Sequence, residues 1–359
     1  MKSLLRSFCL VLCLLVFVSC SADEESVGKD GLTFEERKAL EEPKTVEEKE
    51  EVEIAVDEDL EYPFYLTTMT HLEESFTDDV DEGMFNIHTE SIRSAIDLAD
   101  QYGAKLTFES ERPFAQACIN WGVNVLQEIL DAGHGVGTHC DRGFNKNSYD
   151  TYEEFIDALS VNKKLVDDLI GEENNLGCSG AGSSYDWGSA MIEADFSYVN
   201  GVVAMHYLSM PLDIRPDGYT DDYIKSVVFH SQAPIDLYDR IYPRLLADGL
   251  DFKHDEDGEL VLLSGSVGKL QSQDLNDNND KAPTTSDVDV LIDLLREIDE
   301  NRDRSQIAKI DMYFSINDLN KKNYEVLEYF FQEMEKLVEE GIVVWATQAE
   351  VYHAYMDTL

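Results

Sequence analysis

Basic residues are scarce in this chain. Lysine and arginine together number 28 against 74 aspartates and glutamates, so the 359 residues carry a formal net charge of −46. A field of this sign repels the phosphates of nucleic acids and anionic lipid headgroups. The composition therefore argues against a nucleic-acid partner, and it disfavours strongly anionic polymers as substrates.

Cysteine is also sparse, with six residues and no C-x-x-C pair. The absence of that spacing argues against a structural zinc motif. Cys9, Cys13 and Cys20 lie in the N-terminal segment, which leaves three cysteines for the folded part: Cys118, Cys140 and Cys178. One disulfide with a spare thiol is possible in an exported protein, and the sequence leaves the choice of pair open.

The one long apolar run lies near the N-terminus. Residues 1–19 carry Lys2 and Arg6, then LVLCLLVFV, then small residues, which is the layout of a secretory signal peptide rather than of a membrane span. The segment FVSC resembles a bacterial lipobox, which implies cleavage before Cys20, acylation of Cys20 and a lipid tether at the cell envelope. An ordinary cleaved signal peptide without lipid is the alternative.

The rest of the chain divides into a linker and one large domain. Residues 23–61 hold 17 acidic and 5 basic residues with few aromatics, so residues 20–61 are expected to be a disordered acidic linker. Within 62–359, β-rich segments alternate with amphipathic helices such as 152–170, which favours parallel βα units in a barrel or an open sheet. Residues from about 211 to 285 are poorly periodic and are expected to form a divergent insert.

Ionisable side chains follow the expected strands. In parallel βα folds, reactive residues gather at the carboxyl ends of the strands, where imidazoles and carboxylates can hold a catalytic cation and leave a position open for water. The strand ends supply His71, Glu73, Glu109, Glu111, His139, Asp141, His206 and Asp318.

Two of the eight histidines lie in the stretch GHGVGTHCDRG, residues 133–143. His134 directly follows the glycine that would cap a helix, and we expect it to be a structural turn residue. His139 comes at the end of the next strand and is the stronger candidate for a metal ligand.

Three segments carry a resemblance to a known family. AKLTFES, LDAGHGVGTHCDRG and EKLVEEGIVVWATQAEVYHAY together resemble the polysaccharide deacetylase (NodB-homology) family. The resemblance implies an α/β fold, a distorted (β/α) barrel of about seven parallel strands. It also implies a divalent metal, zinc above all, and removal of acetyl groups from a glycan.

The motifs depart from the family pattern at several points. TTMTHLEES replaces the family's T-F-D-D, and Gly143 stands where its second metal histidine would lie. GCSGAGSS replaces its R-x-P-x-G loop, and SIND lacks its late histidine. The resulting assignment is as follows: catalytic Glu73, His71 and Asp318; metal-binding His139, His71 and Asp141; substrate-binding Glu109, Glu111, Arg112 and Trp187.

Two other functions stay open. A catalytically inactive glycan-binding lipoprotein would explain the lost motifs, since it needs the barrel but not the metal. A glycosidase would need two carboxylates about 5 to 10 Å apart.

Overall fold

The structure is a computed structural model that describes residues 61–72, 76–140, 149–271 and 282–359. These residues all belong to one compact unit, Glu58–Leu359. Residues 1–60 lie outside the described part, and with them the predicted signal peptide, the lipidation site Cys20 and most of the linker. Among the described residues, no helix has the length and apolar character needed to span a membrane.

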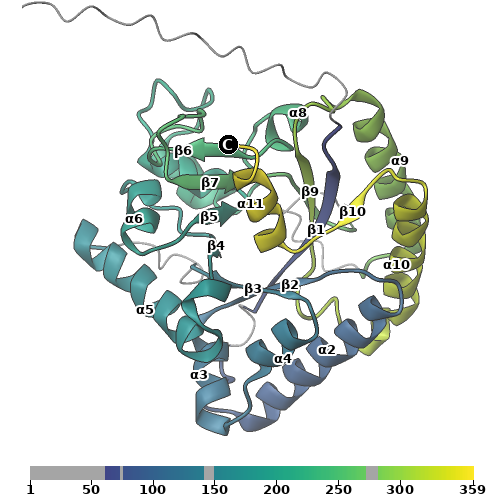
Figure 1. The fold of residues 1–359 in the computed structure, drawn as a ribbon. Coiled ribbons are helices and arrows are strands. Elements are labelled where there is room, and N and C mark those ends of the chain that lie inside the picture. The colour runs from purple at the N-terminus through teal and green to yellow at the C-terminus, as the bar shows by residue number, and fades with distance from the viewer. Residues whose placement is uncertain (1–60, 73–75, 141–148, 272–281) are drawn as a thin grey trace, which may run out of the picture. The chain divides into compact units, whose positions relative to one another are not determined.

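A ten-stranded sheet forms the centre of the fold (Figure 1). Its order is β6-β7-β5-β4-β3-β2-β1-β9-β8, and β10 pairs with β1. The pairings between these ten strands are all parallel except that of β6 with β7. The strands are β1 (Phe64–His71), β2 (Thr107–Ser110), β3 (Gly135–His139), β4 (Gly177–Ser179), β5 (Tyr198–Asn200), β6 (Arg244–Leu246), β7 (Leu260–Leu263), β8 (Ser266–Lys269), β9 (Ala308–Tyr313) and β10 (Val344–Trp345).

Helices lie around this sheet, with α2 to α5 along one part of it and α9 and α10 along another (Figure 1). Their bounds are α2 (Glu82–Asp100), α3 (Arg112–Trp121), α4 (Val125–Asp131), α5 (Tyr152–Ile170), α6 (Trp187–Glu193), α7 (Asp221–Tyr223), α8 (Leu237–Arg240), α9 (Thr285–Asn301), α10 (Tyr324–Glu339) and α11 (Gln348–Met356). The expected alternation of strands and helices, and hence the mostly parallel α/β fold, is confirmed.

Local sequence accounts for the clearest elements. The helix expected at 152–170 is α5, which begins after Thr151, whose hydroxyl accepts a hydrogen bond from the Glu154 amide, and ends at Gly171. In α9 the cap is Thr284, which forms a capping box with Asp287. Strand β1 is buried along nearly all of its length, as expected of a strand covered on both faces.

The sheet has more strands than the seven or so expected, because the insert contributes three of them. Strands β6, β7 and β8 all lie within residues 211–285. Strands β7 and β8 are separated by Ser264 and Gly265 alone, and they pair with β5 and β9 respectively. This short bend therefore links strands from opposite ends of the hydrogen-bonded order.

One local expectation was wrong: the segment GCSGAGSS, expected to be a loop, begins with β4, since Gly177–Ser179 pairs with β3 and β5. After β5 the chain turns at Gly201, which adopts φ 72, and Ala204–Ser209 form the 3-10 helix η3. Gly122 ends α3 in the left-handed conformation and separates it from α4.

Candidate functional site

Three neighbouring strands end in one cluster of ionisable side chains. His71 is the last residue of β1, Glu109 lies in β2 and His139 is the last residue of β3. His71 is directly opposite Glu109 in the parallel register of β1 and β2, and β3 pairs with the other edge of β2. Parallel pairing alone therefore places these three side chains at the same end of the sheet.

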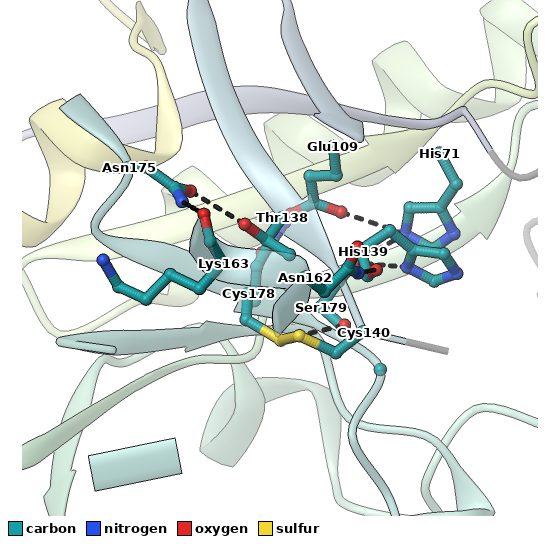
Figure 2. Close-up of a disulfide and its surroundings, with 12 residues drawn as sticks. His71, Glu109, Thr138, His139, Cys140, Asn162, Lys163, Asn175, Cys178 and Ser179 are labelled. Atoms are coloured by element: carbon teal, nitrogen blue, oxygen red, sulfur yellow. Dashed lines mark hydrogen bonds and ion pairs between the residues drawn. A yellow bond between two sulfur atoms is a disulfide. The ribbon is translucent and has the colours of Figure 1, made fainter. Parts of the chain in front are cut away.

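The three side chains are close enough to share one ion. A ligand atom from each of His71, Glu109 and His139 lies within 4.8 Å of the others. His71 Nε2 is 3.0 Å from Glu109 Oε2. The two imidazole rings are stacked, with centroids 3.9 Å apart and planes inclined by 21° (Figure 2).

Ser179, which the sequence analysis did not single out, joins both histidines. It is the last residue of β4, opposite His139 in the register. Its hydroxyl oxygen is 2.8 Å from His139 Nδ1 and 3.1 Å from His71 Nε2. The segment that contains it was expected to be a loop, so nothing in the periodicity placed this hydroxyl at a strand end.

The carboxyl group of Glu109 is fully buried and yet held in its charged form. Burial acts to raise the pKa of Glu109, but hydrogen bonding and the charge of His71, helped by Ser179 and His139, outweigh it and hold the pKa below its usual range. An ionised carboxylate is the state that a metal ligand requires. Tyr313 completes this side of the cluster, its ring edge-on to His71 at 5.0 Å between centroids.

A disulfide lies next to the cluster. Cys140 follows His139, Cys178 precedes Ser179, and the two cysteines are bonded to each other with their Cα atoms 6.3 Å apart (Figure 2). The bond thus answers the pairing that the sequence left open, and it ties the end of β3 to β4. Cys118 is a free thiol buried in α3.

The structure gives His134 a structural role, as expected. Its Nδ1 accepts a hydrogen bond from the Leu106 amide at 3.0 Å, and its Nε2 is 3.2 Å from Asp100 Oδ1. These contacts join His134, which directly precedes β3, to Leu106 just before β2 and to Asp100 at the end of α2. His134 is therefore not part of the ligand cluster.

The other predicted site residues have different surroundings. Glu109 was expected to bind substrate, but it lies in the ligand cluster itself. Glu73 and Asp141 lie outside the described residues. Glu111 is buried at the N-cap of α3, and Arg112 is exposed at the first residue of that helix.

The predicted role of Trp187 does not fit the structure, whereas Asp318 has a local structural contact. The indole ring of Trp187 is fully buried in a hydrophobic cluster, and its Nε1 donates to the His206 carbonyl oxygen at 3.1 Å, so no face is open to a sugar. Asp318 Oδ2 accepts hydrogen bonds from the amide and hydroxyl of Ser315 at 3.0 and 2.9 Å. Asp318 therefore stabilises its own turn after β9.

Comparison with solved structures identifies the fold. No family model matches the sequence, and no curated protein matches it either. A candidate polysaccharide deacetylase from Mycobacterium smegmatis is 12% identical, with a TM-score of 0.51 over 84% of this chain and 92% of that one. The chain has the NodB-like fold of the polysaccharide deacetylases.

The same fold serves more than one named activity. Puue allantoinase aligns with 82% of this chain and 91% of its own length, at 10% identity and a TM-score of 0.54. Identities this low establish the fold alone. The chemistry of this chain therefore depends on its own side chains.

The donor set of the cluster suits a divalent cation. Two imidazoles and one carboxylate form a common catalytic zinc set, which leaves the fourth position for water or substrate. The anionic carboxylate also offsets part of the cation's charge in a buried place, where an isolated charge is costly. His71, Glu109 and His139 therefore fit such an ion both in type and in spacing.

Proposed function

We propose that this protein is a metal-dependent hydrolase of the polysaccharide deacetylase type, which removes acetyl groups from a glycan. The observation that carries the proposal is the His71–Glu109–His139 cluster, in which Glu109 and His139 are buried and His71 is partly exposed, and whose ligand atoms lie within 4.8 Å of one another at the ends of three parallel strands. The fold shared with a candidate deacetylase agrees with this chemistry.

Each member of the cluster has a role in the proposed reaction. His71, Glu109 and His139 hold the cation, and zinc fits the donor set best. A divalent cation in such a site supplies Lewis-acid polarisation of the acetyl carbonyl and lowers the pKa of a water molecule. The Ser179 hydroxyl, 2.8 Å from His139 Nδ1, would orient the His139 imidazole and leave its Nε2 for the cation. Glu73, two residues after His71, is the proposed general base.

A serine hydrolase is the second candidate, because the Ser179 hydroxyl lies within hydrogen-bonding distance of two histidines. In a catalytic triad, one imidazole nitrogen faces the serine and the other faces the acid. Here Ser179 Oγ and Glu109 Oε2 both face the same Nε2 atom of His71, at 3.1 and 3.0 Å. That geometry favours the cation site.

Two other functions, an inactive glycan-binding protein and a glycosidase, are distinguished by the experiments below. A glycosidase needs a second carboxylate across the reacting bond. Glu109 is the one carboxylate of the cation cluster found among the described residues.

We further propose that the protein acts at the cell envelope, tethered by lipid on Cys20 and set away from the membrane by its acidic linker.

The first experiment compares two histidine variants with the wild type. We expect the wild type to bind about one zinc ion per chain and His139→Ala to lose it, because the variant removes one of three ligands. His134→Ala is the matched control: this histidine is also buried but contacts Leu106 and Asp100 instead of the cluster. It should lose stability and keep its zinc.

Metal analysis and acetate release from acetylated glycans provide the measurements. Acetate release that a chelator abolishes and zinc restores would support the proposal. A wild type that binds no zinc would overturn it and leave a glycan-binding role. Release that persists after chelation would point to the serine hydrolase, and cleavage of the glycan chain without metal would point to the glycosidase.

A further inference from the structure

A buried lysine lies two hydrogen bonds away from the proposed cation site. Lys309 of β9 is 1% exposed, and its Nζ donates to Asn200 Oδ1 at 2.7 Å and to the Leu263 carbonyl oxygen at 3.0 Å. Asn200, the last residue of β5, donates from Nδ2 to Glu109 Oε1 at 3.1 Å. We infer that Asn200 and Lys309 are positioning residues that orient the Glu109 carboxylate in the ligand cluster.

The direction of the Asn200 side chain follows from the chemistry of its two neighbours. An ammonium group has three donors and no acceptor, so the atom facing Lys309 must be the amide oxygen of Asn200. The amide nitrogen then faces the opposite way, toward Glu109. Without Lys309 the amide could turn and place its oxygen against the carboxylate, where two acceptors repel each other.

Once its orientation is set, the Asn200 amide in turn sets the orientation of the Glu109 carboxylate. With Asn200 Nδ2 at Oε1, the second oxygen of Glu109 is directed toward His71 Nε2, 3.0 Å away. Hydrogen bonds to a ligating carboxylate set its orientation, and their loss typically lowers metal affinity by about 10–100-fold. This role rests on the proposed cation site, since it concerns how that site is held in shape.

The charge of Lys309 persists at neutral pH although the side chain is buried. Burial lowers its pKa to about 8, against the opposing effect of the Asp311 and Glu109 charges. Removal of that positive charge should by itself strengthen the binding of a cation nearby. Weaker binding after its removal would therefore report a loss of orientation rather than a change of charge.

The test measures zinc affinity of the full chain by chelator competition at pH 7. Asn200→Ala removes the donor to Glu109, and Lys309→Met removes the group that orients the amide while filling a similar volume. Asn175→Ala is the matched control, because Asn175 is equally buried but bonds to Thr138, Lys163 and Asp167. Circular dichroism and urea unfolding verify that each variant is folded.

We expect both Asn200→Ala and Lys309→Met to weaken zinc binding at least tenfold and Asn175→Ala to bind as the wild type does. If Asn200→Ala does not fold, Lys309→Met decides the question alone. Unchanged or tighter binding by Lys309→Met would overturn the inference while the cation site stands. A wild type that binds no zinc would instead overturn the cation site, and the positioning role with it.

Discussion

At the scale of single residues, the site depends on Glu109 and Ser179 as much as on the two histidines. Glu109 supplies the charged oxygen that the imidazoles lack, and Ser179 contacts both rings. Neither role follows from residue type alone, since each depends on which side chains the strand register brings together. Substitutions at these positions therefore separate the possible mechanisms.

Ser179→Ala distinguishes orientation from nucleophilic attack. If Ser179 orients the imidazoles, we expect a fall in kcat/KM of about 10–100-fold, as for other residues that hold metal ligands in place. Loss of a catalytic nucleophile would lower kcat by about a millionfold instead. The measurement is acetate release, with Ser183→Ala as the control, because Ser183 is also buried but accepts a hydrogen bond from the Tyr185 amide.

Lys309 should give the folded protein a distinctive response to alkali. The pKa of Lys309 is about 8 in the folded protein and 10.5 for a lysine exposed to water. Between these two pH values the unfolded chain therefore binds more protons at this position than the folded chain does. Stability from this group therefore rises with pH across that window, by about 3 kcal/mol in total. Lys309→Met lacks the group and should not show this gain.

Urea unfolding of both proteins from pH 7.5 to 10 provides the measurement. The comparison with Lys309→Met is needed because burial raises the pKa of Cys118 to about 11, which lowers stability as the pH rises above 9. The difference between the two proteins cancels that effect. Parallel pH curves for the wild type and the variant would mean that Lys309 titrates normally.

At the scale of elements, the Cys140–Cys178 disulfide joins two short strands that would otherwise be weakly held. Strand β4 has three residues, and the site residues His139 and Ser179 each adjoin one of the bonded cysteines. The cross-link therefore restrains the two residues that contact each other across β3 and β4.

Reduction of this disulfide should lower both stability and cation affinity. The bond closes a separation of 38 residues, for which chain entropy gives about 4 kcal/mol of stabilisation. When the wild type is reduced, we expect the free energy of unfolding measured with urea to fall by about 4 kcal/mol. We also expect zinc binding to weaken under conditions where the reduced protein is still folded. The double variant Cys140→Ala and Cys178→Ala should not respond to reductant, whereas a similar response in it would show that the reductant acts elsewhere than at this bond.

The helices and strands also differ in how well the local sequence predicts them. Helix α5 matches its expected bounds because its apolar stripe, its threonine cap and its terminal glycine all agree. Strand β4 was mispredicted as a loop, since a three-residue strand carries no periodicity, and the helix η3 follows the turn at Gly201. Short elements of this kind are specified by their partners in the fold rather than by their own pattern.

At the scale of the whole molecule, the main feature is the large negative net charge. A formal net charge of −46 over 359 residues implies strong self-repulsion, which disfavours the compact state. Salt screens this repulsion, so the protein should be least stable at low ionic strength.

Thermal unfolding from 0.01 to 1 M NaCl tests this expectation. We expect the Tm to rise by about 2 °C, because about 1 kcal/mol shifts the Tm by about 2–4 °C in a domain of about 150–250 residues and by somewhat less in a larger one. Most of the rise should come below about 0.15 M, because the Debye length has already fallen to about 8 Å there. A rise that continues evenly up to 1 M would indicate a general salting-out effect instead.

The sequence by itself determined the fold class, the alternation of strands and helices, and the placement of His71 and His139 at strand ends, because these depend on local periodicity and on chain direction. Tertiary structure alone decided that Glu109 completes the cluster, that Ser179 joins both histidines, and that Cys140 pairs with Cys178. Those contacts join residues between 38 and 108 positions apart. Their distances depend on strand register and on the bends between strands, which no short window of sequence contains. The buried Lys309–Asn200 pair is a further case, since it joins strands β9 and β5 across 109 positions.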